Sequence, residues 1–111
     1  MDIYFKTNKL QRICSEEKEI KRRLQAKCAE KLKQRLMELR AADTLFDISH
    51  LPPPRCHELS GDKAGIFSVD LEHPYRLLFV PANNPIPLCE DGGIDRKRVT
   101  AIEIITIMDP H

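Results

Sequence analysis

Residues 66–80 have the sequence IFSVDLEHPYRLLFV, and this stretch decides the fold class. Across Ile66–Leu71 the side chains at even and odd positions alternate in polarity, which is the period of a half-buried strand. The pair His73-Pro74 predicts a turn, and Tyr75–Val80 is a second apolar, strand-forming run. Two strands that abut across a tight turn are expected to form an antiparallel hairpin.

Further strands are predicted on both sides of this hairpin. Arg55–Leu59 precedes it as a short strand, and Ile3–Phe5 is expected to be an opening strand. Val99–Met108 is rich in isoleucine and is expected to be a central, buried strand. Residues 81–98 are rich in Pro, Gly, Asn and charge, and they are predicted to form a long loop that is either mobile or functional.

The N-terminal third of the chain has a helical pattern. Asn8 is a candidate cap for a first helix, and Ser15 for a second. Apolar residues then recur every three or four positions, as one stripe of a long amphipathic helix that ends near Ala42: Ile20, Leu24, Cys28, Leu32, Leu36 and Leu39. The remaining basic side chains, Arg35 among them, are expected on its outer faces. Residues 8–42 are therefore predicted to form a two-helix hairpin.

These elements together predict an α+β fold in which the N-terminal strand and the helical hairpin pack on a mostly antiparallel sheet of four or five strands. The sheet is expected to occupy residues 55–108. A length of 111 residues, with 41% hydrophobic and 32% charged residues, predicts one globular domain over residues 1–111. No run approaches 18 apolar residues and no signal-peptide pattern is found, so we expect a cytoplasmic protein with no membrane partner.

The net charge of +1 conceals an asymmetry. Residues 1–42 carry 12 Lys and Arg against 6 Asp and Glu, whereas residues 43–111 carry 6 against 11. A chain divided in this way can present a cationic face to phosphates or to an acidic partner. The alternative is a charged helix surface that only keeps the protein in solution.

The sequence favours neither a metal nor a small-molecule cofactor. The four cysteines, at positions 14, 28, 56 and 89, form no C-x-x-C pair and are interpreted as structural. There is no P-loop, no glycine-rich dinucleotide motif, no G-x-S-x-G and no H-E-x-x-H. Arg76 is more informative, because a guanidinium inside an apolar strand needs a partner or a ligand. The alternative for Arg76 is a structural ion pair with Asp70 on the neighbouring strand.

Residues 55–69, RCHELSGDKAGIFSV, resemble the central signature of the RelE/ParE superfamily toxins, and most closely the HigB-type killer proteins of toxin–antitoxin systems. The pattern there is approximately His-x-Leu-x-Gly-Asp-x-x-Gly-aromatic-Ser-Val. Residues 73–79, HPYRLLF, are similar to the family's Trp/Tyr-Arg-Ile/Leu-x-Phe strand, and the chain ends in Asp-Pro-His where the family often ends in Asp-Tyr-His. Two positions depart from the pattern, because Ser60 replaces a Lys and Pro110 replaces the Tyr.

The resemblance implies a RelE-like fold and a growth-inhibiting toxin of a type II toxin–antitoxin pair. It implies a metal-independent endoribonuclease that enters the ribosomal decoding site and cleaves mRNA there. By position, Arg76 would stabilise the phosphate, and His111 and His57 would be the acid–base candidates. The residues implied to contact RNA or its phosphates are Lys63, Asp109, Arg55, Arg22 and Arg23.

The partners implied by the resemblance are a cognate helix-turn-helix antitoxin, the ribosome and mRNA. Two alternatives remain open from the sequence. One is a non-catalytic or gyrase-inhibiting member of the same fold. The other is a small interaction module whose basic helices bind an acidic partner.

Overall fold

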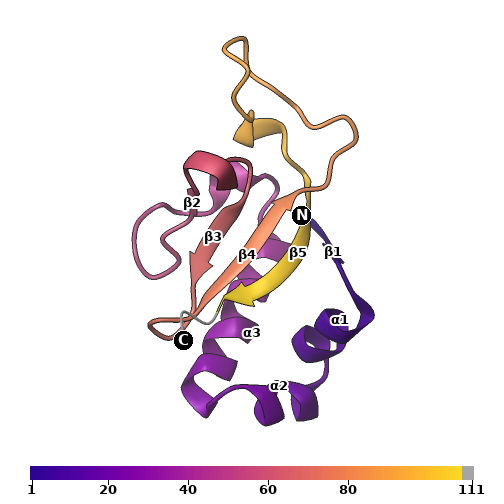
Figure 1. Cartoon of the computed structure of the whole chain (residues 1–111), viewed down its shortest axis with the longest axis vertical. Coiled ribbons are helices and arrows are strands. Elements are labelled where there is room, and N and C mark those ends of the chain that lie inside the picture. Colours follow the sequence, from indigo (N-terminus) through magenta and orange to yellow (C-terminus); the bar gives the residue numbers. More distant parts are fainter. Residues whose placement is uncertain (109–111) are drawn as a thin grey trace.

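The computed structural model describes residues 1–108, in which a five-stranded sheet carries helices on one face (Figure 1). The strands are β1 (Asp2–Phe5), β2 (His57–Glu58), β3 (Phe67–Asp70), β4 (Arg76–Pro81) and β5 (Ala101–Met108). Their order in the sheet is β1-β5-β4-β3-β2. Only the β1–β5 pair is parallel, so the predicted α+β class with a mostly antiparallel sheet is confirmed.

The β3–β4 hairpin forms in the way that its alternating sequence predicts. Phe67 is paired with Phe79, and the two buried rings stack with their centroids 5.9 Å apart. Val69 and Leu77 are paired on the same buried face. Side chains directly opposite each other lie on one face of a sheet, so these four residues form the floor on which the helices pack.

β5 is an interior strand of the sheet, as expected, but it is not buried on both faces. It lies between β1 and β4, and the burial of its first half alternates: Ile102 and Ile104 are buried, whereas Ala101 and Glu103 are only partly buried. The physical reason is that helices cover only one face of the sheet, so every second residue of β5 points away from the core. The pairing also shifts register between Leu78, which faces Thr106, and Phe79, which faces Ile104.

The predicted helical hairpin contains three helices instead of two. α1 (Asn8–Ser15) is capped by the Thr7 hydroxyl, not by Asn8. The expected long helix is divided into α2 (Glu17–Arg23) and α3 (Ala26–Ala41) by extended backbone at residues 24–25. One helix over residues 15–42 would be about 42 Å long, whereas the eight residues of β5 span only about 26 Å. The break lets Ile20 of α2 remain buried beyond the end of the sheet.

The long loop after β4 is held in place by its own polar groups. Asn83 Oδ1 accepts hydrogen bonds from the backbone N–H groups of Thr100 and Ala101. Arg98 Nη2 donates to the carbonyl oxygen of Leu88 at 2.8 Å. These contacts attach the loop to the residues before β5, so it is an ordered arm of the fold. Among the helices of residues 1–108, none is long and apolar enough to cross a membrane.

Candidate active site

The candidate site lies on the face of the sheet opposite α3, which passes behind the strands in Figure 1. Arg76 at the start of β4 is paired with Asp70 on one side and with Met108 on the other. His57 on β2 belongs to the adjacent row of this face, where it is paired with Ser68. Two strand spacings and two residue steps separate His57 from Arg76, which corresponds to about 12 Å between their Cα atoms. Both side chains can therefore reach one ligand on this face.

Asp70 holds two guanidinium groups with unequal strength. Arg55 Nε donates to Asp70 Oδ2 at 2.6 Å, and Arg55 Nη2 donates to Oδ1 at 3.3 Å. Arg76 Nε lies 3.8 Å from Asp70 Oδ1, and its side chain is 33% exposed. The ion pair anticipated as the alternative for Arg76 is present, but it is long, and Arg55 takes the short hydrogen bonds. Two cations against one carboxylate leave this cluster with a net positive charge.

His57 is oriented by a backbone carbonyl group. Its Nδ1 lies 3.1 Å from the carbonyl oxygen of Arg55, and because a carbonyl oxygen can only accept, Nδ1 carries the hydrogen. In the neutral ring the lone pair is then on Nε2, the atom that can take a proton from a substrate. The neighbouring Cys56 is buried on the other side of the strand, and burial raises the pKa of its thiol to about 11. Cys56 is therefore protonated at neutral pH and is not a nucleophile.

Arg55 has an unusual backbone conformation. Its φ is +44°, and it is the one non-glycine residue with positive φ among residues 1–108. This conformation is incompatible with a strand, so β2 begins at His57 and not at Arg55 as the sequence suggested. The adjacent backbone is anchored by hydrogen bonds from the Cys56 N–H to the Ser49 carbonyl and from the Asp70 N–H to the Pro54 carbonyl.

A family profile described as the RelE-like toxin of the type II toxin–antitoxin system HigB matches residues 3–88. The chain belongs to the HigB-like toxin family. No curated protein sequence matches it significantly. The matched region contains β2, β3, β4 and all of β1 but its first residue, and it includes Arg55, His57 and Arg76. Membership makes this chain a toxin of the type II class and implies an antitoxin partner.

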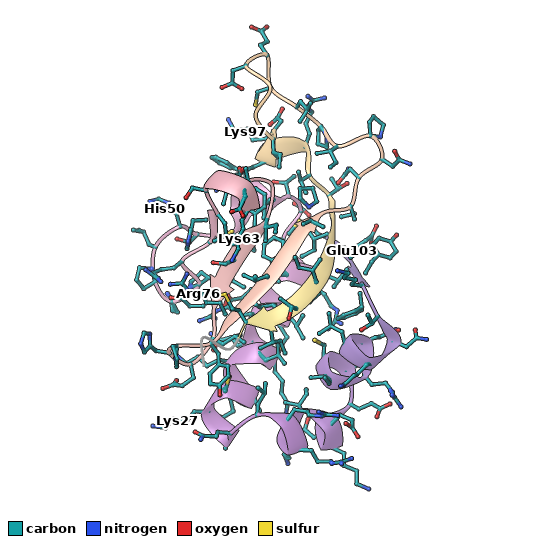
Figure 2. The ribbon with its side chains drawn as sticks, viewed as in Figure 1. Lys27, His50, Lys63, Arg76, Lys97 and Glu103 are labelled. Carbon is teal, nitrogen blue, oxygen red and sulfur yellow. The ribbon has the colours of Figure 1, made fainter. Side chains whose placement is uncertain are left out.

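In this HigB-like chain, Lys63 lies on a 3₁₀ turn (Gly61–Lys63), and Figure 2 shows it near β3 with Arg76 below it. Glu58 Oε2 accepts a hydrogen bond from the Gly65 N–H at 2.9 Å, which closes the turn. The φ of Gly65 is +93°, a conformation that side chains other than glycine rarely adopt. The turn therefore holds the Lys63 backbone at the edge of the site.

Arg35 is the important residue that the sequence analysis misplaced. It was expected on an outer face of the helix, but its residue surface is 1% exposed. Its Nε donates to the Asp70 carbonyl oxygen at 2.8 Å, and its Nη1 donates to Glu38 Oε1 at 2.7 Å. Arg35 thus holds the backbone of Asp70 from the helix side, while the Asp70 carboxylate engages Arg55 and Arg76. A signal was present in the sequence, because Arg35 is flanked by the buried positions 32, 36 and 39 and has an acidic residue three positions on.

Two of the remaining predicted site residues lie on α2 and form no hydrogen bond or ion pair with this cluster among residues 1–108. Arg22 and Arg23 are on α2, at the bottom of the view in Figure 1, and Arg22 is ion-paired with Glu19 at 3.2 Å. Asp109 and His111 lie outside the described residues. Met108, the last described residue, is the register partner of Arg76.

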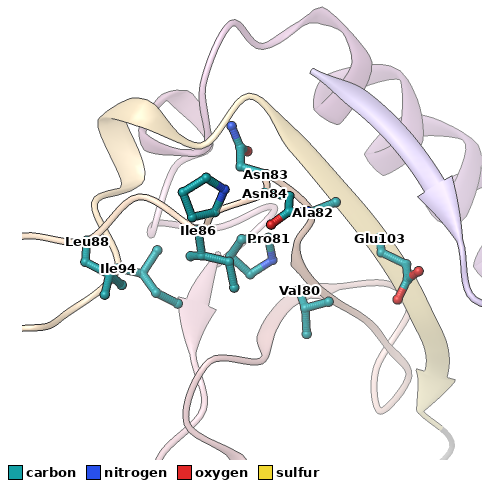
Figure 3. Close-up of a pocket in the computed structure, with 10 residues that line it drawn as sticks. Val80, Pro81, Ala82, Asn83, Asn84, Ile86, Leu88, Ile94 and Glu103 are labelled. Atoms are coloured by element: carbon teal, nitrogen blue, oxygen red, sulfur yellow. The ribbon is translucent and has the colours of Figure 1, made fainter.

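No other feature of residues 1–108 competes with this cluster as a catalytic site. They contain no group of three or more His, Cys, Asp or Glu side chains that could hold a metal ion. A hollow of about 760 Å³ lies between the end of β4 and the long loop (Figure 3). Glu103 is its one charged lining residue, and a lone carboxylate among apolar side chains repels a phosphate.

Proposed function

We propose that this HigB-like toxin is a ribosome-dependent endoribonuclease that blocks translation by cleaving mRNA. The observation that carries the proposal is the partial exposure of the Arg76 side chain and its long ion pair with Asp70. The Arg76 guanidinium is partly exposed on the face of the sheet opposite α3, and the only carboxylate beside it in the described structure is already hydrogen-bonded to Arg55. A cation held in this way is available to a phosphate group.

The proposed reaction is attack of a ribose 2′-oxygen on the adjacent phosphorus. The 2′-hydroxyl loses its proton to His57 Nε2, the new P–O bond closes a 2′,3′-cyclic phosphate, and the bond to the 5′-oxygen breaks. The leaving 5′-oxygen takes up a proton, for which His111 is our candidate donor. Arg76 stabilises the charge that develops on the phosphorane-like transition state. No metal ion takes part.

Lys63 and the basic helices supply the rest of the proposed RNA contacts. Lys63 stands three positions after Ser60, where the family pattern has a Lys, and its ammonium group can meet the same phosphate. Asp109 is proposed to contact RNA or to position its neighbours. Arg22 and Arg23 on α2 are proposed to lie against ribosomal RNA, where their affinity would come from phosphate contacts. A helix-turn-helix antitoxin is the proposed neutralising partner, and the site of action is the cytoplasm.

The test is a cleavage assay with the purified full chain, ribosomes and a defined mRNA, read by primer extension. We expect cuts that need ribosomes and that disappear in Arg76→Ala. The matched control is Lys6→Ala, which also removes one exposed cation but lies in the link between β1 and α1. Intact mRNA at a saturating concentration of the chain would refute the nuclease proposal. Growth inhibition together with intact mRNA would favour the non-catalytic alternative.

A further inference from the structure

Arg55 contacts both halves of the candidate site. Its side chain forms the two hydrogen bonds to the Asp70 carboxylate, and Asp70 is also the partner of Arg76. Its carbonyl oxygen accepts the hydrogen bond from His57 Nδ1. One residue thus connects the cation for the phosphate to the candidate general base.

The strained backbone of Arg55 makes this double contact possible. A non-glycine residue at φ +44° persists only where the surrounding structure holds it, and such residues are concentrated at functional sites. Here the Arg55 N–H donates to the Leu51 carbonyl, and both flanking segments are hydrogen-bonded. The left-handed residue immediately precedes β2 and leaves the carbonyl group of Arg55 directed at the His57 ring.

We propose that Arg55 is the positioning residue of the site and does not itself bind RNA. It fixes the protonated nitrogen of His57, and it occupies the Asp70 carboxylate so that Arg76 stays free for the phosphate. This inference rests on the proposed nuclease function. It also assigns a role to Asp70, which neutralises Arg55 and keeps Arg76 within 3.8 Å of a fixed anion.

The proposal is tested by a double-mutant cycle of Arg55→Gln and Asp70→Asn in single-turnover cleavage on programmed ribosomes. Each single variant is expected to lower the maximal rate by about tenfold or more, because misplacing a catalytic group by 1 Å costs up to about a hundredfold. The half-saturating ribosome concentration should stay within about twofold of the wild-type value. The double variant should be no slower than the slower single variant, because both changes break the same contact.

Direct RNA binding by Arg55 gives a different pattern. Arg55→Gln would then raise the half-saturating concentration at an unchanged maximal rate, and Asp70→Asn would lower it by releasing the Arg55 guanidinium from its carboxylate. That pattern, or a wild-type rate in Arg55→Gln, would overturn the inference. If the wild-type chain itself leaves mRNA intact, both the proposed function and this inference fail. If the wild-type chain cleaves mRNA and Arg55→Gln cleaves it equally fast, only this inference fails.

Two further variants separate positioning from stability. Arg55→Gly removes the side chain but adopts positive φ without strain, so we expect a Tm no lower than that of Arg55→Gln and an equally low maximal rate. Arg98→Gln is the matched control, because it removes a guanidinium from the exposed ion pair with Asp95, at 2.8 Å, outside the site. It should cleave at the wild-type rate. A wild-type rate in Arg55→Gly would overturn the inference.

Discussion

Replacing Arg35 tests whether a buried charge anchors the helical layer to the candidate site. The guanidinium donates to the Asp70 carbonyl oxygen at 2.8 Å and to Glu38 at 2.7 Å, and the side chain is enclosed in the core. Two substitutions separate its contributions. Arg35→Met removes the charge and keeps most of the packing, whereas Arg35→Ala removes both.

The expected loss follows from these contacts. Losing a hydrogen bond to a carbonyl group that stays buried costs about 1–3 kcal/mol. The side chain of Glu38 is 32% exposed, so its carboxylate can hydrate and adds little. In Arg35→Ala the buried methylenes are also lost, at about 0.8 kcal/mol each, with a further cost for the space left behind. We therefore expect Arg35→Met to lower the free energy of unfolding by about 1–3 kcal/mol, and Arg35→Ala by about 3–5 kcal/mol.

Urea unfolding followed by circular dichroism measures both values, and the slope m should not change. At about 4 °C per kcal/mol, the Tm should fall by roughly 4–12 °C in Arg35→Met and by roughly 12–20 °C in Arg35→Ala. Buried ion pairs can be replaced by apolar residues without loss, because desolvation offsets their attraction. An Arg35→Met variant as stable as the wild type would therefore refute the anchoring role.

Three smaller predictions concern separate parts of the fold. Arg76→Ala should lower the Tm by no more than a few degrees, because Asp70 keeps its short hydrogen bonds to Arg55, and thermal unfolding checks this. Burial raises the pKa of both Cys14 and Cys56 to about 11, so the unfolded chain loses these protons first and stability should fall as the pH rises from about 9 to 11. Unfolding across that range should show a shallower fall in the Cys14→Ala/Cys56→Ala variant. Asn83→Ala should speed limited proteolysis of the loop after β4, with sheet unfolding little changed, because the Asn83 amide holds that loop to Thr100 and Ala101.

The hairpin was predictable because its determinants are local. The alternation in residues 66–71 and the turn at His73-Pro74 specify which side chains face the core, and the structure pairs Phe67 with Phe79 accordingly. The broken helix was not predictable in the same way. The apolar stripe continues unchanged through Leu24, and the break depends on where the sheet ends, which is a property of the assembled layers.

Arg76 was identified as a candidate from its position in an apolar strand, and His57 from the resemblance of its segment to the family signature. Their arrangement was not, because Arg55 and Asp70 are 15 residues apart and Arg35 is 35 residues from Asp70. A basic residue in a helix is normally solvated, so the pattern placed Arg35 outside, whereas packing of α3 on the sheet buried it and supplied an acceptor. Strand order, register and the positive φ of Arg55 determine which charges share the Asp70 carboxylate. Local patterns thus specify helices, strands and candidate site residues. The contacts between residues distant in the chain are determined only when the helices pack on the sheet.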